Sequence, residues 1–267
     1  MAESSVDRPA PARTLEGAGA IITGGASGLG AASARALVAR GARVALVDVN
    51  AEQTERTAGG LGDSAVALTA DVTDEDAVSK AVEAARQQIG NLRVAVLCAG
   101  VGWAERVVAR HGPAQMEFFQ KVMQVNVIGT YNVLRLTAAA MAENEPDEDG
   151  ARGAVVMTAS VAAFDGQIGQ TAYSASKGAI VSLTLPAARD LSRFGIRVNT
   201  IAPGVFDTPL LGALPEETRD SLAAGIPFPS RLGQPDDFAL LACQLVENPY
   251  VNGETIRLDG ALRMAPK

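Results

Sequence analysis

Short apolar runs rich in β-branched residues alternate with longer stretches of helical periodicity along almost the whole chain. Strands of a parallel sheet are buried on both faces and are joined by helical crossovers, so this alternation predicts repeated βαβ units. The predicted strands are 18–23, 43–48, 65–70, 94–98, 154–158, 197–202 and 255–258. The predicted helices are 28–40, 51–59, 74–89, 114–142, 172–194 and 235–247. We therefore expect an α/β, doubly wound fold with a seven-stranded parallel sheet flanked by helices.

The length of the chain fits one domain of this kind. With 267 residues, of which 48% are hydrophobic and 20% charged, the chain can bury a large core. Residues 1–15 hold acidic residues, dispersed basic residues and two prolines but no apolar signal-peptide core, and we expect a flexible tail. The single domain is then 16–267, and a proline-containing interruption at about 205–233 is expected to be the substrate loop.

The charge and the small number of histidines and cysteines disfavour several functions. The formal net charge is −7, so no overall positive field attracts the protein to nucleic acid or anionic lipid. Cys98, Cys243 and His111 are too few for a disulfide framework or a usual zinc site, and His111 lies in a polar, loop-like stretch. We expect no metal and no Ser-His-Asp catalysis. No apolar run reaches the roughly 18 residues of a membrane span, so a cytoplasmic protein is predicted.

A glycine-rich segment, TGGASGLG at residues 23–30, joins the first predicted strand to the first predicted helix. Glycines let backbone N–H groups and a helix N-terminus approach a pyrophosphate, although a tight strand-to-helix connection would use them too. The candidate phosphate-loop residues are Gly24, Ser27, Gly28, Leu29 and Gly30. Asp48 ends the second strand, where a carboxylate either caps the strand or accepts both ribose hydroxyls. No arginine follows Asp48 to receive a 2′-phosphate, so a Rossmann-type NAD site is favoured over an NADP site.

Three side chains suited to proton transfer occur together later in the chain. Tyr173 and Lys177 occupy positions i and i+4 of a predicted helix and project from one face. Ser160 follows a predicted strand and can return to the same edge of the sheet. Taken singly, a surface Tyr–Lys pair and a strand-end serine cap explain these residues. Together, after a dinucleotide loop, they predict a phenol whose pKa a nearby ammonium and an oxidised nicotinamide ring lower for acid/base work. Asn126 lies on the core-facing side of helix 114–142, where a buried amide needs a partner.

These motifs resemble the short-chain dehydrogenase/reductase family from Ala18 to the C-terminus. The stretches that carry the resemblance are 23–30, Cys98-Ala99-Gly100, Asn126, Ser160, Tyr173, Lys177 and 199–204. The family's usual Asn-Asn-Ala-Gly is Leu97-Cys98-Ala99-Gly100 here, which removes two side-chain amides but keeps Ala99 and Gly100. Stretches 161–167, 183–186, 227–233, 247–249 and 256–261 are more closely similar to the type 2 3-hydroxyacyl-CoA dehydrogenases of that family, whereas 101–113 matches them poorly.

The resemblance implies a role for each matching residue. Tyr173 is the general acid/base, Ser160 positions the substrate oxygen, Lys177 lowers the phenol pKa and binds the nicotinamide ribose, and Asn126 orders a relay water. The cofactor residues implied are Asp48 for the adenosine ribose, Asp71 and Val72 for adenine, Ala99 and Gly100 for the nicotinamide ribose, Thr208 for the carboxamide, and also Cys98, Pro203, Gly204 and Val205. Gln167 and Leu210 are the candidate substrate contacts, although a solvated loop amide and a helix at a subunit contact explain them too.

The resemblance thus predicts an NAD-dependent oxidoreductase of fatty acid metabolism that interconverts 3-hydroxyacyl-CoA and 3-ketoacyl-CoA. One alternative is a hydroxysteroid or other secondary-alcohol dehydrogenase. A second is a nucleotide-binding scaffold or RNA-processing subunit with little turnover, although the net charge gives RNA binding no support. The resemblance and the apolar C-terminal stretch 251–264 predict a homotetramer with a small-molecule substrate and no membrane partner.

Overall fold

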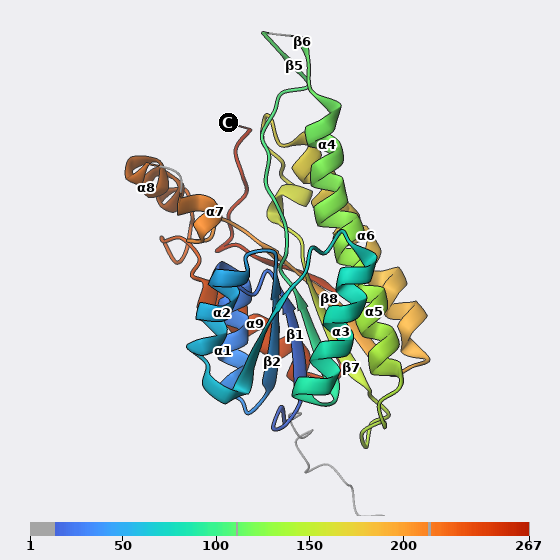
Figure 1. The fold of residues 1–267 in the computed structure, drawn as a ribbon. Helices are drawn as coiled ribbons and strands as arrows, with labels where there is room; N and C mark the ends of the chain where they lie inside the picture. The colour runs from blue at the N-terminus through green and yellow to red at the C-terminus, as the bar shows by residue number, and fades with distance from the viewer. Residues whose placement is uncertain (1–13, 111, 213–214, 267) are drawn as a thin grey trace, which may run out of the picture.

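The sheet of this protein has seven strands, all parallel (Figure 1). The computed structural model describes residues 14–110, 112–212 and 215–266. Across the sheet the strands run in the order β3 (Ala65–Thr69), β2 (Arg43–Asp48), β1 (Gly19–Thr23), β4 (Leu92–Leu97), β7 (Gly153–Thr158), β8 (Ile196–Pro203) and β9 (Thr255–Leu258). Every neighbouring pair is parallel. The predicted doubly wound α/β fold is confirmed, with strand limits shifted by at most two residues.

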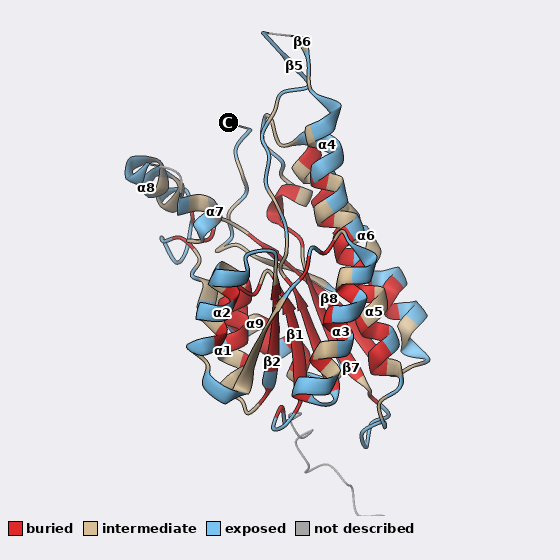
Figure 2. Cartoon of the chain, in the orientation of Figure 1, coloured by how far each residue is buried: buried red, intermediate tan, exposed pale blue. Residues whose placement is uncertain are grey.

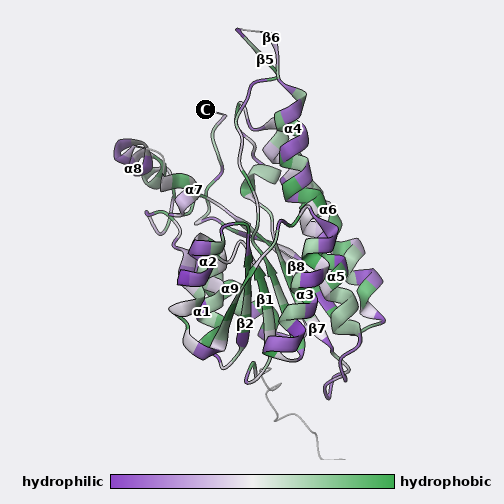
Figure 3. Cartoon of the chain, in the orientation of Figure 1, coloured by the Kyte–Doolittle hydropathy of each residue, from purple (hydrophilic) through white to green (hydrophobic). Residues whose placement is uncertain are grey.

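Helices cover both faces of the sheet because successive strand residues point to opposite faces. In β1, Ile21 packs into one core cluster while Ala20 and Ile22 pack into the other. The first cluster lies under α3 (Glu75–Ile89), α5 (Thr130–Ala142) and α6 (Thr171–Ser192), and the second under α1 (Gly28–Val38), α2 (Ala51–Gly59) and α9 (Pro235–Glu247). The inner strands β1, β4, β7 and β8 are accordingly buried over most of their length, whereas the edge strands β3 and β9 are only half-buried (Figures 2 and 3).

Side-chain caps fix where two of the helices begin. The Asp74 carboxylate accepts a hydrogen bond of 2.9 Å from the Ala77 N–H at the start of α3, and the Asn50 amide oxygen accepts one of 3.1 Å from the Gln53 N–H at the start of α2. Such caps each contribute about 1 kcal/mol to helix stability. The loops that leave β2 and β3 are therefore short, with α2 beginning at Ala51 and α3 at Glu75.

The predicted helix 114–142 is wrong as one continuous helix. It begins at α4 (Met116–Met123), passes through a π-helical turn at Gln124–Gly129 and continues as α5. A π turn inserts extra backbone and is typical of functional sites. Gly129 makes room for it, because an added Cβ would lie 2.5 Å from Val72 Cγ2. Hydrophobic periodicity does not detect such a local change in helical register.

The remaining segments rise above the carboxyl edge of the sheet (Figure 1). They are the short hairpin β5 (Val108–Ala109) and β6 (Gly112–Pro113), and helices α7 (Pro209–Gly212) and α8 (Glu216–Ala224) within the expected substrate loop. Most of the expected tail, 1–15, lies outside the described residues, but Leu15 is buried in the core. Among the described helices, none is long and apolar enough to cross a membrane, and the cytoplasmic location stays a prediction.

Candidate active site

Two cavities meet at the carboxyl edge of the sheet. One, of about 370 Å³, extends from the glycine loop to the end of β3, and the other, of about 530 Å³, lies between β7, α6 and the 205–233 segment. They share the lining residues Leu29, Cys98, Gly100, Val101 and Thr208. The two cavities are therefore halves of one cleft, and we call them the nucleotide groove and the substrate cavity.

The glycine loop forms the floor of the nucleotide groove. Gly24 has a φ of +65°, and an added Cβ there would lie 2.9 Å from the Ala99 backbone nitrogen. The loop thus packs directly on the turn after β4, which only glycine permits. Helix α1 begins at Gly28, and its first-turn N–H groups have no intrahelical acceptor and lie beside the groove. This geometry provides donors for an anion.

Asp48 stands at the end of β2 on the wall of the same groove. Its carboxylate accepts hydrogen bonds from the Ala26 N–H at 3.3 Å and the Asn50 N–H at 3.1 Å. Those two bonds hold the half-buried carboxylate in place and leave acceptor capacity, since an ionised carboxylate has about four lone-pair sites. Asp48 can therefore cap the end of its strand and still accept hydrogen bonds from ribose hydroxyls.

The three predicted proton-transfer residues line the substrate cavity together. Ser160 follows β7, and its hydroxyl accepts a hydrogen bond of 3.1 Å from the Ala162 N–H. Tyr173 and Lys177 lie on the first turns of α6, with the Lys177 ammonium 5.8 Å from the centre of the Tyr173 ring. Lys177 is only 5% exposed and donates a hydrogen bond of 2.8 Å to the Thr158 carbonyl. The i and i+4 spacing on α6 thus places both side chains at the substrate cavity.

Burial dominates the electrostatics of this cluster. Burial raises the pKa of the Tyr173 phenol, and a hydrogen bond with Ser160 opposes that shift. Burial also lowers the pKa of Lys177 to about 8, and raises the pKa of the neighbouring Cys98 thiol to about 11. Burial therefore has the larger effect on the phenol, and the lowering of its pKa by the ammonium together with a nicotinamide ring stays a prediction.

Asn126 is fully buried in the π turn and connects three parts of the site. Its amide oxygen accepts from the Val101 N–H at 2.8 Å, and its NH₂ group donates to the Val101 carbonyl at 2.9 Å and to the Ser176 hydroxyl at 3.0 Å. The amide pairs with Val101 as a neighbouring strand would. The expectation that Asn126 needs a partner is met, and the relay water stays a prediction.

The structure gathers the predicted cofactor residues into the one cleft. Those lining the nucleotide groove are Gly24, Ser27, Gly28, Leu29, Gly30, Asp48, Asp71, Val72, Cys98, Ala99, Gly100 and Thr208. Pro203, Gly204 and Val205 line the substrate cavity, as does Gln167. The Gln167 side chain, however, donates its hydrogen bond to the Ala265 carbonyl at 3.1 Å. The side chain of Leu210 lies outside the described part of the structure.

Several lining residues were not among the predicted site residues, although three of them lie in the expected substrate loop. The substrate cavity also contacts Trp103, Phe206, Leu211, Leu222 and Met264. Trp103 stacks on Phe118 with ring centres 4.0 Å apart. Met264 lies near the C-terminus, far along the chain from Ser160 and Tyr173, so its place depends on how the C-terminal segment folds back. An exposed aromatic residue such as Trp103 was the signal that could have identified the 101–113 segment as a wall.

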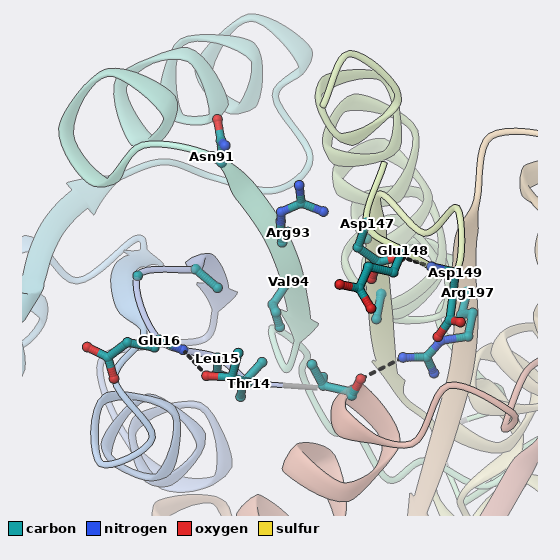
Figure 4. A pocket seen from close by; sticks show the side chains of 15 residues that line it. Thr14, Leu15, Glu16, Asn91, Arg93, Val94, Asp147, Glu148, Asp149 and Arg197 are labelled. Carbon is teal, nitrogen blue, oxygen red and sulfur yellow. Dashed lines mark hydrogen bonds between the residues drawn. The ribbon is translucent and has the colours of Figure 1, made fainter. Parts of the chain in front are cut away.

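A further cavity, also of about 530 Å³, lies at the opposite, amino end of the strands (Figure 4). Acidic residues from the 147–149 loop line it, together with Glu16, Arg93 and Arg197. Arg197 is 7% exposed and donates to the Leu245 and Val246 carbonyls at 2.7 and 2.6 Å, at the end of α9. Because these arginine bonds satisfy the last carbonyls of a helix, we assign Arg197 a structural role.

The lowered pKa of Lys177 predicts how stability changes with pH. Between about pH 8 and 10.5 the folded protein binds fewer protons at Lys177 than the unfolded chain does, so the free energy of unfolding rises with pH in that window. Below pH 8 the buried ammonium destabilises the fold. We expect Lys177→Met to raise the melting temperature of the cofactor-free protein at pH 7 and to lose that advantage towards pH 10. Equal differences in melting temperature at both pH values would contradict this assignment.

The sequence of this cleft and fold matches a known enzyme class. A family model described as short chain dehydrogenase matches residues 18–219, and the chain belongs to the short-chain dehydrogenase family of oxidoreductases. The 3-hydroxyacyl-CoA dehydrogenase type-2 of Homo sapiens is 52% identical over 259 residues, which cover 96% of this chain and 99% of the human one. The protein of that name from Rattus norvegicus is 51% identical with the same coverage. The resemblance stated from the sequence is confirmed.

Solved structures of dehydrogenases and reductases are also similar to this chain over nearly its full length. The crystal structure of 3-hydroxyacyl-CoA dehydrogenase type-2 from Mycobacterium avium has a TM-score of 0.91 and 52% identity, covering 95% of this chain and 98% of that one. A 3-ketoacyl-(acyl-carrier-protein) reductase from Brucella melitensis, crystallised with NADH, has a TM-score of 0.84 and 31% identity, covering 94% and 100% of the two chains. The backbone of the cleft is thus shared with dehydrogenases and reductases.

Proposed function

We propose that this protein is an NAD-dependent dehydrogenase that interconverts 3-hydroxyacyl-CoA and 3-ketoacyl-CoA. The observation that carries the proposal is the junction of the nucleotide groove with a cavity that holds Ser160, Tyr173 and Lys177. A nicotinamide at that junction would meet a substrate oxygen held by the two hydroxyls. Support for the acyl-CoA substrate comes from the relatives named above, which match the chain over nearly its full length.

The residues of the nucleotide groove fit a dinucleotide. The first-turn N–H groups of α1 suit a pyrophosphate, and the Asp48 carboxylate suits ribose hydroxyls. The loop is also contacted by the segment expected to hold the carboxamide, because a Cβ added to Gly28 would lie 3.5 Å from Pro209 Cδ and 3.7 Å from Thr208 Cβ. Thr208 lines both cavities, and Lys177 lines the substrate cavity beside the shared residue Gly100, so these two side chains would hold the nicotinamide half. When bound, the nicotinamide ring supplies the hydride acceptor or donor.

The protein's own part in the reaction is proton transfer at the substrate oxygen. During oxidation the Tyr173 phenolate takes the proton of the secondary alcohol, and during reduction the phenol returns it. The Ser160 hydroxyl donates a hydrogen bond to the same oxygen and is held in place by the Ala162 N–H. Because burial raises the pKa of Tyr173, the phenolate would be stabilised by the Lys177 ammonium together with the positive charge that an oxidised nicotinamide would supply.

The apolar side of the substrate cavity suits an acyl chain or another apolar ketone. Phe206, Leu211, Leu222 and Met264 line it beside Tyr173. A steroid or simple secondary alcohol is the competing substrate class, and a protein without turnover is the competing non-enzyme function. The test is to measure NADH oxidation with acetoacetyl-CoA, free acetoacetate and a steroid ketone in parallel. We expect acetoacetyl-CoA to be reduced with the highest kcat/KM; a higher value for the steroid, or no turnover, would contradict the proposal.

We also propose a homotetramer with two-fold symmetries. Large apolar side chains remain exposed on α5, α6 and α9, among them Tyr131 at 51%, Leu185 at 44% and Leu240 at 52%. A lone domain leaves such surfaces in water, whereas symmetric assembly buries them. Light scattering on the native protein is expected to give four times the 27.4 kDa chain mass. A particle of the monomer mass would exclude this assembly.

A further inference from the structure

The last residues of the chain fold back over the loop that separates Ser160 from Tyr173. The Ile168 N–H donates to the Pro266 carbonyl at 3.0 Å, and the Gln167 side chain donates to the Ala265 carbonyl at 3.1 Å. Met264, from the same segment, lines the substrate cavity. Figure 1 shows the C-terminal end of the chain above the sheet, on the same side as α4 and α7. The C-terminal segment 260–266 is therefore a wall of the site.

Arg257, near the end of β9, ties this wall to the loop. Its guanidinium donates to the Asp165 carboxylate at 2.6 Å, to the Asp259 carboxylate at 2.7 Å and to the Leu262 carbonyl at 3.0 Å. It also lies over the Phe164 ring, with its central carbon 5.2 Å from the ring centre. One planar cation thus reaches the loop, the strand end and the C-terminal segment at once.

This arrangement is stronger than an ordinary surface ion pair. The side chains of Arg257, Asp165 and Asp259 are 20%, 21% and 8% exposed, so their charges are partly withdrawn from water. Short charge-assisted bonds in such surroundings are roughly twice as strong as neutral ones and fix direction as well as distance. The Arg257 hydrogen bond also lowers the pKa of Asp165, which keeps that carboxylate ionised. The fork of a guanidinium can hold three acceptors, whereas an ammonium is a single point of charge.

We infer that Arg257 is a positioning residue and Met264 a specificity-determining residue for the acyl part of the substrate. Arg257 holds the C-terminal wall against the 165–170 loop, and Met264 then limits how long or how branched a chain can lie beside Tyr173. The loop connects Ser160 to Tyr173. The contacts of Arg257 with this loop therefore also fix the part of the substrate cavity next to the reacting oxygen. The inference rests on the proposed function for its substrate class, but its geometry applies to any apolar ketone in the cavity.

The first experiment compares Met264→Ala with the unaltered enzyme on two 3-ketoacyl-CoA substrates, one of four and one of eight or more acyl carbons. The smaller side chain enlarges the cavity, so we expect the ratio of kcat/KM for the long substrate over the short one to rise about tenfold. The NAD dissociation constant should not change. An unchanged ratio would exclude Met264 as a determinant of chain length.

The second experiment tests Arg257 with Arg257→Gln and Arg257→Lys. We expect Gln to raise the KM for the ketone about tenfold with a smaller change in kcat, and Lys to restore only part of the loss, because it cannot hold three acceptors. The matched control is Arg86→Gln, which removes a 2.7 Å pair with Glu143 far from the cleft. Equal KM values for Arg257→Gln and the control, or an equal loss of NAD affinity, would overturn the positioning role.

A truncation after Leu262 keeps the inference testable if Arg257→Gln does not fold. It removes the wall, including Met264 and Ala265, but retains each acceptor of Arg257. The truncated protein should bind NAD with unchanged affinity and show the same rise in the long-to-short ratio of kcat/KM as Met264→Ala. An unchanged ratio would show that the C-terminal segment does not limit the length of the acyl chain. If the unaltered enzyme reduces no acyl-CoA, the proposed function fails, and the ratio is measured on a large and a small member of whichever ketone class it reduces.

Discussion

Replacing Tyr173 with phenylalanine is expected to lower kcat by at least 100-fold while the affinity for NAD stays the same. The ring is retained, so its packing against Lys177 survives, and only the hydroxyl that exchanges a proton with the substrate is removed. A positioned acid/base contributes typically about 10²–10⁴-fold to the rate. The loss should therefore appear in kcat and in kcat/KM alike, as for an interaction made in the transition state.

Steady-state kinetics with 3-hydroxybutyryl-CoA and NAD dissociation constants measured by fluorescence separate the two quantities. Lys177→Ala provides the contrast, because we expect it to weaken NAD binding as well as turnover. A Phe variant that keeps more than about a tenth of the original kcat, which lies below the range for a general acid/base, would show that Tyr173 is not the proton-transfer group.

Cofactor choice is expected to depend on Asp48, with kcat/KM for NAD exceeding that for NADP on the order of 100-fold. The carboxylate accepts hydroxyl donors, and it repels a 2′-phosphate at close range. Its position is set by the Ala26 and Asn50 N–H groups, so it has little freedom to move away.

Asp48→Ala should reduce the NAD preference by at least tenfold, mainly by weakening NAD binding. Asp71→Ala is the comparison within the same groove, and it should affect both cofactors similarly. Equal use of NAD and NADP by the unaltered enzyme would refute the assignment of Asp48.

The residues that could be placed from the sequence are those whose position follows from strand topology. The carboxyl ends of parallel strands meet at one edge, so once the strands were assigned, Gly24, Asp48, Cys98 and Ser160 had to lie near one another. Tyr173 and Lys177 followed from helical spacing alone. These residues line one cleft in the structure.

The features that could not be predicted depend on contacts distant in sequence. The π turn at Gln124–Gly129 is stabilised by the bond between Asn126 and Val101, and no periodicity in the helix encodes that bond. The place of Met264 depends on Arg257 and Asp165, which are 92 positions apart in the chain. The direction of the Tyr173 pKa shift depends on burial, which a local motif does not reveal.

The pairing of Asn126 with Val101 restricts which amino acids can replace this asparagine. The Val101 N–H requires an acceptor, while the Val101 carbonyl and the Ser176 hydroxyl each take a hydrogen from the NH₂ group. Aspartate has the right shape but no donor, leucine has neither, and glutamine is one methylene longer in a site with no exposed surface. Any substitution must therefore move the turn after β4 or the π turn. Protein engineers who change the apolar wall of the substrate cavity to alter its specificity should leave this single amide unchanged.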